Sequence, residues 1–396
     1  YGRATKAAAY ALKARVLLYA ASPLFNGNAD YAKFANEDGT LLFAPKDDSK
    51  WGKAAAAAKE AIDKIEGSSY YGLYYSDEPD NGYRNYMELF LPSKKWNKEY
   101  IFARNQGTGY SDNIHQEKCM AANGMGGWSG LCPTQELVDA YEMANGSTPI
   151  IGYNADGTPI INGASGYSET GFAATAGKHY PAGVYNMYVG REPRFYASIN
   201  FNGQQWRGRQ LEFWQGGKDG INVSKVDYCC TGYLLRKTAD EGVDVINGKG
   251  GMKEASILFR VGSLYLDYAE ALNEAEGPVD DVYKYVDAIR KRAGLPGLAK
   301  GLDKDKMRER IQHERQIELA FEAGHRYFDC HRWKIAEKTD NGYMHGMNIT
   351  ATNKVDYSKR STVGDSRVFE KKHYLFPIPQ SEMDKRIGLV QSPYWE

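Results

Sequence analysis

The sequence carries no excess of charge of either sign, because its 50 Lys and Arg residues balance its 50 Asp and Glu residues. Proteins that bind the phosphate backbone of nucleic acids usually show a basic surplus, so we expect no nucleic-acid partner. The sequence also lacks a run of about 18 apolar residues and any basic amphipathic stretch. We therefore expect neither a transmembrane helix nor a membrane-surface helix.

Cysteine is scarce, with 5 residues in 396, and the spacing of these residues matches no zinc-binding pattern. Cys119 and Cys132 flank a glycine-rich loop and are candidates for a disulfide in an oxidising compartment. A disulfide between the adjacent Cys229 and Cys230 would be strained. Because the cysteine count is odd, at least one thiol, such as that of Cys330, is free or pairs outside this chain.

The chain begins at Tyr1 rather than at Met, and no signal peptide is present. Its first segment already has the pattern of a helix that enters a hydrophobic core. We therefore expect that an amino-terminal part of the parent protein is missing. Any targeting signal or lipid anchor would have been lost with it.

Aromatic residues and glycine are abundant, with 30 Tyr, 7 Trp, 14 Phe and 42 Gly. Tyr and Trp combine a broad apolar face with one polar atom. Many such rings on glycine-rich loops suit the recognition of flat, amphipathic ligands such as sugars. The alternative for each ring is ordinary core packing, because large side chains are mostly buried.

Residues 1–69 have the pattern of a pair of antiparallel helices. The first is predicted by helical spacing of Ala8, Ala11, Leu12, Arg15, Leu18 and Tyr19, and it ends at Pro23. The second is "SKWGKAAAAAKEAIDKIEG", with Ser49 as the predicted N-cap and Gly67 as the stop signal.

The rest of the chain divides into three further segments. Residues 70–253 are rich in Gly, Asn, Tyr and Trp, with short strand-like runs and recurrent turn signals, and are predicted to be loop-rich. Residues 254–340 return to helices, and their helix–turn–helix form of near 34 residues resembles a tetratricopeptide repeat. Residues 341–396 form a predicted extended tail, in which Pro377 and Pro379 forbid a helix.

The segment from Glu318 to Lys334, "ELAFEAGHRYFDCHRWK", has two interpretations. His325, Asp329 and His331 would form a catalytic or metal cluster in the first. "HERQI" at His313, however, lacks the second histidine of a zinc-protease motif, and no nucleophile elbow is present.

The second interpretation is structural, and we favour it. Ile317, Phe321, Gly324 and Phe328 form one predicted buried stripe. Glu322 and Arg326 are spaced as an i, i+4 ion pair. The predicted charge network consists of Arg315, Glu318, Glu322, Arg326, Asp329 and Arg332.

Several stretches resemble the SusD/RagB family. The strongest is "RQIELAFEAGHRYFDCHRWK", although Cys330 stands where Leu is common and Ala323 is an extra residue before Gly324. The others, in family order, are "GRATKAAAYALKARVLLYAASPLF", "PTQELVDAYEM", "REPRFYASINFNG", "TGYLLRK", "LYLDYAEALNEA", "AIRKRAGLP" and "YLFPIPQSEMD". The resemblance covers nearly the whole chain.

This resemblance implies a mainly α fold, in which tetratricopeptide-like helix pairs form a scaffold and irregular loops with short strands form a ligand-binding face. Residues 70–253 would carry that face, and residues 341–396 would pack on the scaffold. It also implies a lipid-anchored protein of the bacterial outer membrane, exposed at the cell surface. Such a protein captures oligosaccharides, or peptides in some branches, and passes them to a SusC-like TonB-dependent transporter without catalysis.

Candidate ligand-binding rings lie on the loop-rich segment, where sugar CH faces would stack on aromatic faces. The main candidates are Trp96, Trp128, Trp206, Trp214, Tyr74 and Tyr180, with Tyr71, Tyr75 and Tyr185 as further possibilities. No cofactor is predicted. "SDEPDNG" from Ser76 to Gly82 offers oxygen ligands for calcium, but it lacks EF-hand spacing and is more typical of a turn.

Two other functions compete with glycan capture. A secreted carbohydrate-active enzyme would need two carboxylates facing each other across a cleft, for which Glu212 and Asp219 are the candidates. A helical-repeat protein would bind peptides on a concave helix face, but too few regular repeats are present for a free-standing array.

Overall fold

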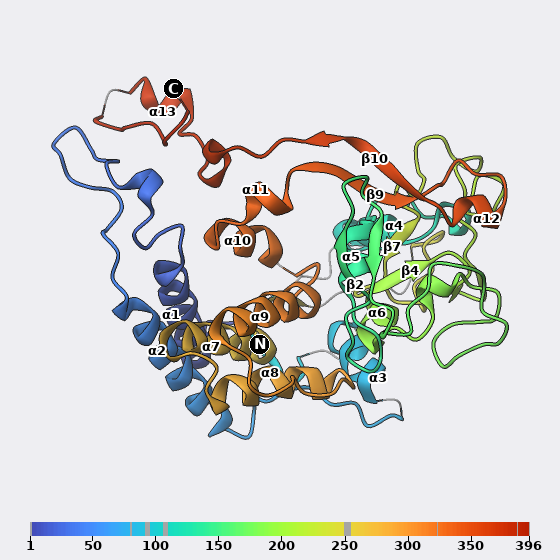
Figure 1. Ribbon diagram of the computed structural model, residues 1–396, viewed down its shortest axis with the longest axis horizontal. Helices are drawn as coiled ribbons and strands as arrows, with labels where there is room; N and C mark the ends of the chain where they lie inside the picture. The colour runs from blue at the N-terminus through green and yellow to red at the C-terminus, as the bar shows by residue number, and fades with distance from the viewer. Residues whose placement is uncertain are drawn as a thin grey trace.

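A computed structural model describes residues 2–79, 81–91, 96–105, 110–248, 255–322, 324–385 and 387–395. Asp80 of the predicted turn and Ala323 of the family motif lie outside these residues. Figure 1 shows long helices gathered on one side of the molecule and short strands with long loops on the other. No helix in the described part of the chain is both long and apolar enough to cross a bilayer.

The helical side is built from two antiparallel pairs. α1 (Lys6–Ala21) packs on α2 (Ser49–Glu66), and α7 (Val261–Glu276) packs on α2, α8 (Asp280–Arg292) and α9 (Lys304–Glu318). The buried face of α1 consists mainly of alanines, which allow the close approach of its neighbours. This arrangement confirms the predicted scaffold of helix pairs.

The ends of these helices follow local chemistry. The Thr5 side chain accepts from the Ala8 amide at the start of α1, and Gly67 ends α2 as predicted. The predicted N-cap of α2 is wrong by one residue, because Asp48 occupies that position. Ser49 is the first helical residue, and its hydroxyl donates to Asp47 instead.

The helix expected to carry the buried stripe from Ile317 to Phe328 is interrupted in the structure. α9 ends at Glu318, α10 spans His325–Arg332 and α11 spans Ala336–Thr339. Phe321 and Gly324 have φ values of 62° and 73°, which a right-handed helix cannot accommodate. Phe321 and Phe328 are therefore exposed, at 42% and 47%, while Ile317 is fully buried.

Apart from the carboxyl-terminal hairpin, the described residues of the loop-rich side form four separate two-stranded antiparallel pairs. β1 (Tyr100–Asn105) pairs with β8 (Ala255–Arg260), and β2 (Ile150–Tyr153) pairs with β3 (Pro159–Ile161). β4 (Ile199–Phe201) pairs with β7 (Tyr233–Leu235), and β5 (Gln205–Trp206) pairs with β6 (Arg209–Gln210).

Short helices connect these pairs: α3 (Asn81–Met87), α4 (Tyr110–Met120), α5 (Gln135–Ala140) and α6 (Pro193–Ser198). An aromatic core holds this side together, with Tyr188, Phe195, Phe201, Trp206 and Tyr233 all nearly inaccessible. The rings of Tyr188 and Phe201 lie 4.4 Å apart at their centroids. The core explains why loops this long hold a defined shape.

The carboxyl-terminal segment spans both sides of the molecule. Its hairpin, β9 (Gly342–Met347) with β10 (Arg360–Arg367), packs on α5 of the loop-rich side. Beyond the hairpin, Tyr374 packs with Leu24 and Tyr31 near α1, and Lys371 lies 2.8 Å from Asp30. Figure 1 shows this segment passing above α10 towards α13 (Gln380–Met383).

All five cysteines, each within the described residues, are free thiols. The candidate disulfide between Cys119 and Cys132, which the sequence left open, is therefore not formed. The Cys132 thiol instead lies 3.9 Å from the thiol of Cys229.

Candidate functional site

The charged segment around α10 is a buried ion-pair network. Arg315 on α9 donates to Asp267 on α7 at 2.7 Å and to Asp329 on α10 at 2.9 Å. Arg332 donates to Asp329 at 2.9 Å and to Glu270 at 2.7 Å. Burial opposes ionisation of Asp329, but the two guanidinium groups outweigh it and lower the pKa of that carboxyl. These contacts lock α7, α9 and α10 together.

A second network surrounds Glu318 at the end of α9. Its carboxylate accepts from Arg260 at 2.8 Å and from Arg194 at 3.1 Å, and it also contacts Arg292. Against the effect of burial, these cations lower the pKa of Glu318. All four side chains are inaccessible to solvent, so the network is part of the interior.

The predicted ion pair of Glu322 with Arg326 is wrong. Glu322 accepts from Arg260 at 2.7 Å and from Lys237 at 2.6 Å, and these cations lower its pKa to about 2 despite burial. Arg326 makes no ion pair with any described residue. Burial in turn lowers the pKa of Lys237 to about 8.

The histidines of α10 also lie in the interior. Burial, followed by the charges of Arg15 and Arg315, lowers the pKa of His325 to about 4. His331 Nδ1 lies 2.7 Å from the Tyr327 carbonyl oxygen, and its ring packs against Phe369. Among the described residues no group of three or more His, Cys, Asp or Glu is placed to hold a metal ion. The geometry supports the structural interpretation.

An open aromatic cavity lies on the loop-rich side, and we call it the tyrosine cavity. It consists of two adjoining hollows of about 560 and 680 Å³. The residues that line both hollows are Pro79, Lys178, His179, Tyr180 and Tyr196. Tyr83 lines the first hollow and Gly294 the second.

The rings of the tyrosine cavity are ordered against one another. His179 stacks on Tyr83 with centroids 4.7 Å apart and planes 28° apart. Tyr180 lies over Tyr196 at 6.1 Å and 26°. Gly177 allows this placement, because a Cβ there would lie 2.3 Å from the Tyr180 ring. Apolar ring faces at defined angles are the surfaces on which sugar rings stack.

Polar groups border these rings. Arg236 donates to the Tyr83 hydroxyl at 2.6 Å and to Glu241 at 3.1 Å. The Gln204 side chain is 2% exposed, and its Nε2 has no partner among the described atoms. A buried amide that is left without a partner costs free energy, so a ligand hydroxyl that accepts from it would relieve this cost.

Of the six main candidate rings, only Tyr180 lines the tyrosine cavity. Trp96 and Tyr71 line a separate hollow of about 460 Å³ near the amino terminus. Tyr74 is half-buried, and its hydroxyl donates to Glu88 at 2.8 Å. Trp128 is half-buried against His115.

The remaining candidates have structural contacts. Trp206 is 1% exposed, with Arg236 over its ring at 4.8 Å, so its predicted role as an open platform is wrong. Lys354 lies 5.2 Å above the half-buried ring of Trp214. Tyr75 is exposed near Lys98, and the Tyr185 hydroxyl donates to the Glu169 carbonyl oxygen.

Sequence reasoning missed three rings of the cavity. Tyr83 comes from α3, His179 from a loop and Tyr196 from α6. The motif "REPRFYASINFNG" contains Tyr196, which is buried in the same aromatic core as its neighbour Phe195 but also lines the cavity. Nothing in the motif distinguishes the two rings. Their convergence depends on tertiary packing.

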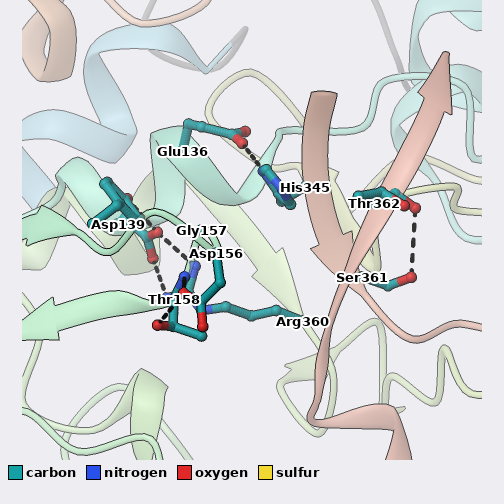
Figure 2. Close-up of a pocket in the computed structure, with 10 residues that line it drawn as sticks. Glu136, Asp139, Asp156, Gly157, Thr158, His345, Arg360, Ser361 and Thr362 are labelled. Atoms are coloured by element: carbon teal, nitrogen blue, oxygen red, sulfur yellow. Dashed lines mark hydrogen bonds and ion pairs between the residues drawn. The ribbon is translucent and has the colours of Figure 1, made fainter. Parts of the chain in front are cut away.

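A second cavity of about 480 Å³, shown in Figure 2, lies between α5, the β2–β3 turn and the β9–β10 hairpin. We call it the arginine cavity. Arg360 donates to both oxygens of Asp139, at 2.7 and 2.9 Å, and His345 lies 2.6 Å from Glu136. Its rings are Tyr153, whose hydroxyl donates to Asp139, and His345. Both rings are engaged by carboxylates, and Arg360 is paired with Asp139, which leaves this cavity less suited to stacking a sugar.

The proposed catalytic carboxylates do not face each other across a cleft. Asp219 is 1% exposed and accepts from both Nη atoms of Arg209, at 2.7 and 2.6 Å. The same carboxylate accepts from the Glu212 amide, and the Glu212 side chain accepts from the Lys218 amide. Both acids hold a turn together.

Residues 92–395 match the SusD family, and the chain belongs to that family. The solved structure of BT4246 superposes with a TM-score of 0.81 at 28% identity, covering all of this chain and 72% of that one. A SusD-like carbohydrate-binding protein of Bacteroides fragilis, BF0978, gives 0.68 at 23% identity, covering 97% and 64%. These results confirm the predicted family and fold class.

A curated relative, SusD-like protein P25 of Formosa agariphila, is 42% identical over 82 residues. The matched segment is 20% of this chain and 15% of that protein. The chain therefore spans a small part of this curated relative.

Proposed function

We propose that this protein binds oligosaccharides in the tyrosine cavity and releases them chemically unchanged. The observation that carries the proposal is the ordered group of Tyr83, His179, Tyr180 and Tyr196 in an open hollow. Membership of the SusD family, and the carbohydrate-binding description of BF0978, support the same ligand class.

The ligand would contact the cavity in two ways. The faces of Tyr180 and His179 would receive the CH face of a sugar ring, and Gln204 Nε2 would donate to a hydroxyl. The cavity is open rather than enclosed, which suits a chain that extends beyond the bound residues. We expect affinities in the micromolar-to-millimolar range, because few rings contact each sugar.

Calorimetric titration with neutral and uronate-bearing oligosaccharides tests this proposal. Tyr180→Ala should weaken binding by about tenfold, which corresponds to about 1.4 kcal/mol. Tyr153→Ala in the arginine cavity is the matched control and should leave the affinity unchanged. Equal affinity of both variants and the parent protein would place the ligand elsewhere.

The wider role follows from the family resemblance. We propose that the protein is lipid-anchored at the outer-membrane surface in cells and delivers its ligand to a SusC-like TonB-dependent transporter. Co-purification of the protein, expressed from its native gene, with such a transporter from solubilised outer membranes tests this step. Recovery of the protein without any outer-membrane barrel would contradict it, whatever the result of the titration.

A further inference from the structure

Two thiols that are distant in the sequence meet on the loop-rich side. Cys132 Sγ lies 3.9 Å from Cys229 Sγ, although 97 positions separate the two residues. Cys132 follows the glycine-rich loop that carries Trp128, and Cys229 precedes β7. Sulfur atoms at this distance are in van der Waals contact, about 2 Å further apart than in a disulfide.

The backbone around each thiol is anchored. The Leu235 amide of β7 donates to the Leu131 carbonyl oxygen at 2.9 Å, which ties the two segments side by side. The Cys229 thiol donates to the Tyr233 carbonyl oxygen at 2.9 Å, and the Cys132 thiol donates to that of Ser129 at 3.1 Å. A disulfide would require the two sulfur atoms to approach each other by about 2 Å between segments that the Leu235–Leu131 backbone bond already ties together.

A third thiol gives this pair access to solvent. Cys229 is 3% exposed, and a dissolved oxidant cannot reach it directly. The neighbouring Cys230 is exposed, and the nearby Cys132 thiol, followed by burial, raises the pKa of the Cys230 thiol. Cys330 is buried in a separate cluster with Leu24 and Tyr31. Cys119 lies closer, because its carbonyl oxygen accepts from the Leu131 amide at 3.0 Å, so the variants below include it.

We propose that Cys132 and Cys229 form a reversible intramolecular disulfide, with Cys230 as the entry point for the oxidant. The Cys230 thiolate attacks a small-molecule or protein disulfide, forms a mixed disulfide and releases one thiol. The Cys132 thiolate then attacks Cys230 Sγ and displaces the second thiol of the oxidant. Finally the Cys229 thiolate attacks Cys132 Sγ and frees Cys230.

The reaction is balanced. The protein loses two electrons and two protons as Cys132 and Cys229 become a disulfide, and the oxidant gains them as two thiols. The direct bond between Cys229 and Cys230 is disfavoured, because adjacent cysteines cannot reach disulfide geometry without strain.

The cross-link would tie the end of the glycine-rich loop, and the start of α5, to β7. A disulfide that closes so long a loop restricts the unfolded chain, so it should raise the thermal midpoint by about 3–6 °C. The proposal concerns thiol chemistry in the purified chain, so it is independent of glycan binding. Only its occurrence in cells depends on the proposed surface location.

The test starts from the fully reduced chain, which is then exposed to oxidised glutathione. Thiol counting in denaturant should fall from five to three. Trypsin should yield residues 119–178 joined to residues 226–236, with fragmentation assigning the bond to Cys132 and Cys229. The thermal midpoint of unfolding should rise by about 3–6 °C on oxidation and return to its original value after reduction.

Three variants keep the result specific. Cys132→Ser should abolish the joined peptide, Cys119→Ser should retain it, and Cys230→Ser should retain it but form it severalfold more slowly. Five remaining thiols after oxidation would overturn the proposal. So would a final product that joins Cys132 to Cys230, a bond from Cys119, or oxidation that yields only disulfide-linked dimers.

Discussion

The carboxylate of Glu318 accepts from Arg260 Nη1 at 2.8 Å across 58 positions of sequence, and both side chains are buried. Glu318→Gln removes one negative charge and leaves Arg260, Arg292 and Arg194 under-compensated. A buried ion pair that loses one partner costs about 3–5 kcal/mol, so we expect a loss of that size in the free energy of unfolding. Urea denaturation measures it.

The matched control is Glu309→Gln, which removes an exposed pair with Lys306 on the same helix. Its expected cost is below about 1 kcal/mol. Similar losses for the two variants would show that the Glu318 network does not hold the interior together.

The stability of the protein should depend on the protonation of His325. Burial lowers its folded-state pKa from 6.5 to about 4, so between these values the unfolded chain binds more protons than the folded one. The contribution of this group is fully present above pH 6.5 and is lost as the pH falls through 4. At pH 5 about 2 kcal/mol should already be lost relative to pH 7.5.

Urea denaturation at pH 7.5 and pH 5 measures how much unfolding free energy is lost between the two values. In His325→Gln that loss should be about 2 kcal/mol smaller than in the unsubstituted protein. His115→Gln, which changes an exposed ring, should leave the dependence as in the parent protein. If His325→Gln lost as much unfolding free energy between pH 7.5 and pH 5 as the unsubstituted protein, the buried, neutral state of this histidine would be contradicted.

The glycine-rich loop depends on a close backbone approach at Gly127. A Cβ there would lie 2.1 Å from the Ala121 carbonyl oxygen. This oxygen belongs to the backbone, so relieving the clash would require the backbone itself to shift. Gly127→Ala should therefore destabilise the protein by about 1–3 kcal/mol and change the fluorescence of Trp128. Gly163→Ala has no atom within 4 Å of its added Cβ and should be within about 0.5 kcal/mol of the parent protein.

Replacing Trp206 should cost more free energy of unfolding than replacing Trp128, because Trp206 is in the core and Trp128 is half-buried. Trp206→Ala removes a buried ring and should cost about 3–5 kcal/mol in thermal or urea unfolding. Trp128→Ala removes a half-buried ring on a loop and should cost clearly less. A smaller cost for Trp206→Ala than for Trp128→Ala would contradict the placement of Trp206 in the core.

Local sequence signals predicted the helical scaffold well. Helical spacing and the stop at Gly67 predicted α2. The predicted helix–turn–helix form of residues 254–340 corresponds to α7 and α8, which Gly277, with φ of 86°, separates. Each of these signals acts within one or two turns of the chain. They are visible without knowledge of the partners in space.

The end of α9 could not be predicted in this way. The spacing of Ile317, Phe321 and Phe328 continues a helical pattern, so it indicated one long stripe. Glu322 instead pairs with Arg260, 62 positions away, and with Lys237, 85 positions away. These long-range ion pairs decide the backbone path, and no local pattern encodes them.

The tyrosine cavity has the same origin. Tyr83 and His179 stack although they are 96 positions apart, and Arg236 donates to Tyr83 from 153 positions away. The sequence showed that the loop-rich segment was rich in rings. It could not show which rings face outward, because the aromatic core of the same segment uses the same residue types.

The most direct test of the central claim is a calorimetric titration followed by chromatography of the recovered oligosaccharide. The parent protein should bind a glycan of the panel, Tyr180→Ala should bind it about tenfold more weakly, and the glycan should elute unchanged in length. Shortened products from the purified protein, or full affinity in Tyr180→Ala, would contradict a non-catalytic glycan site in the tyrosine cavity.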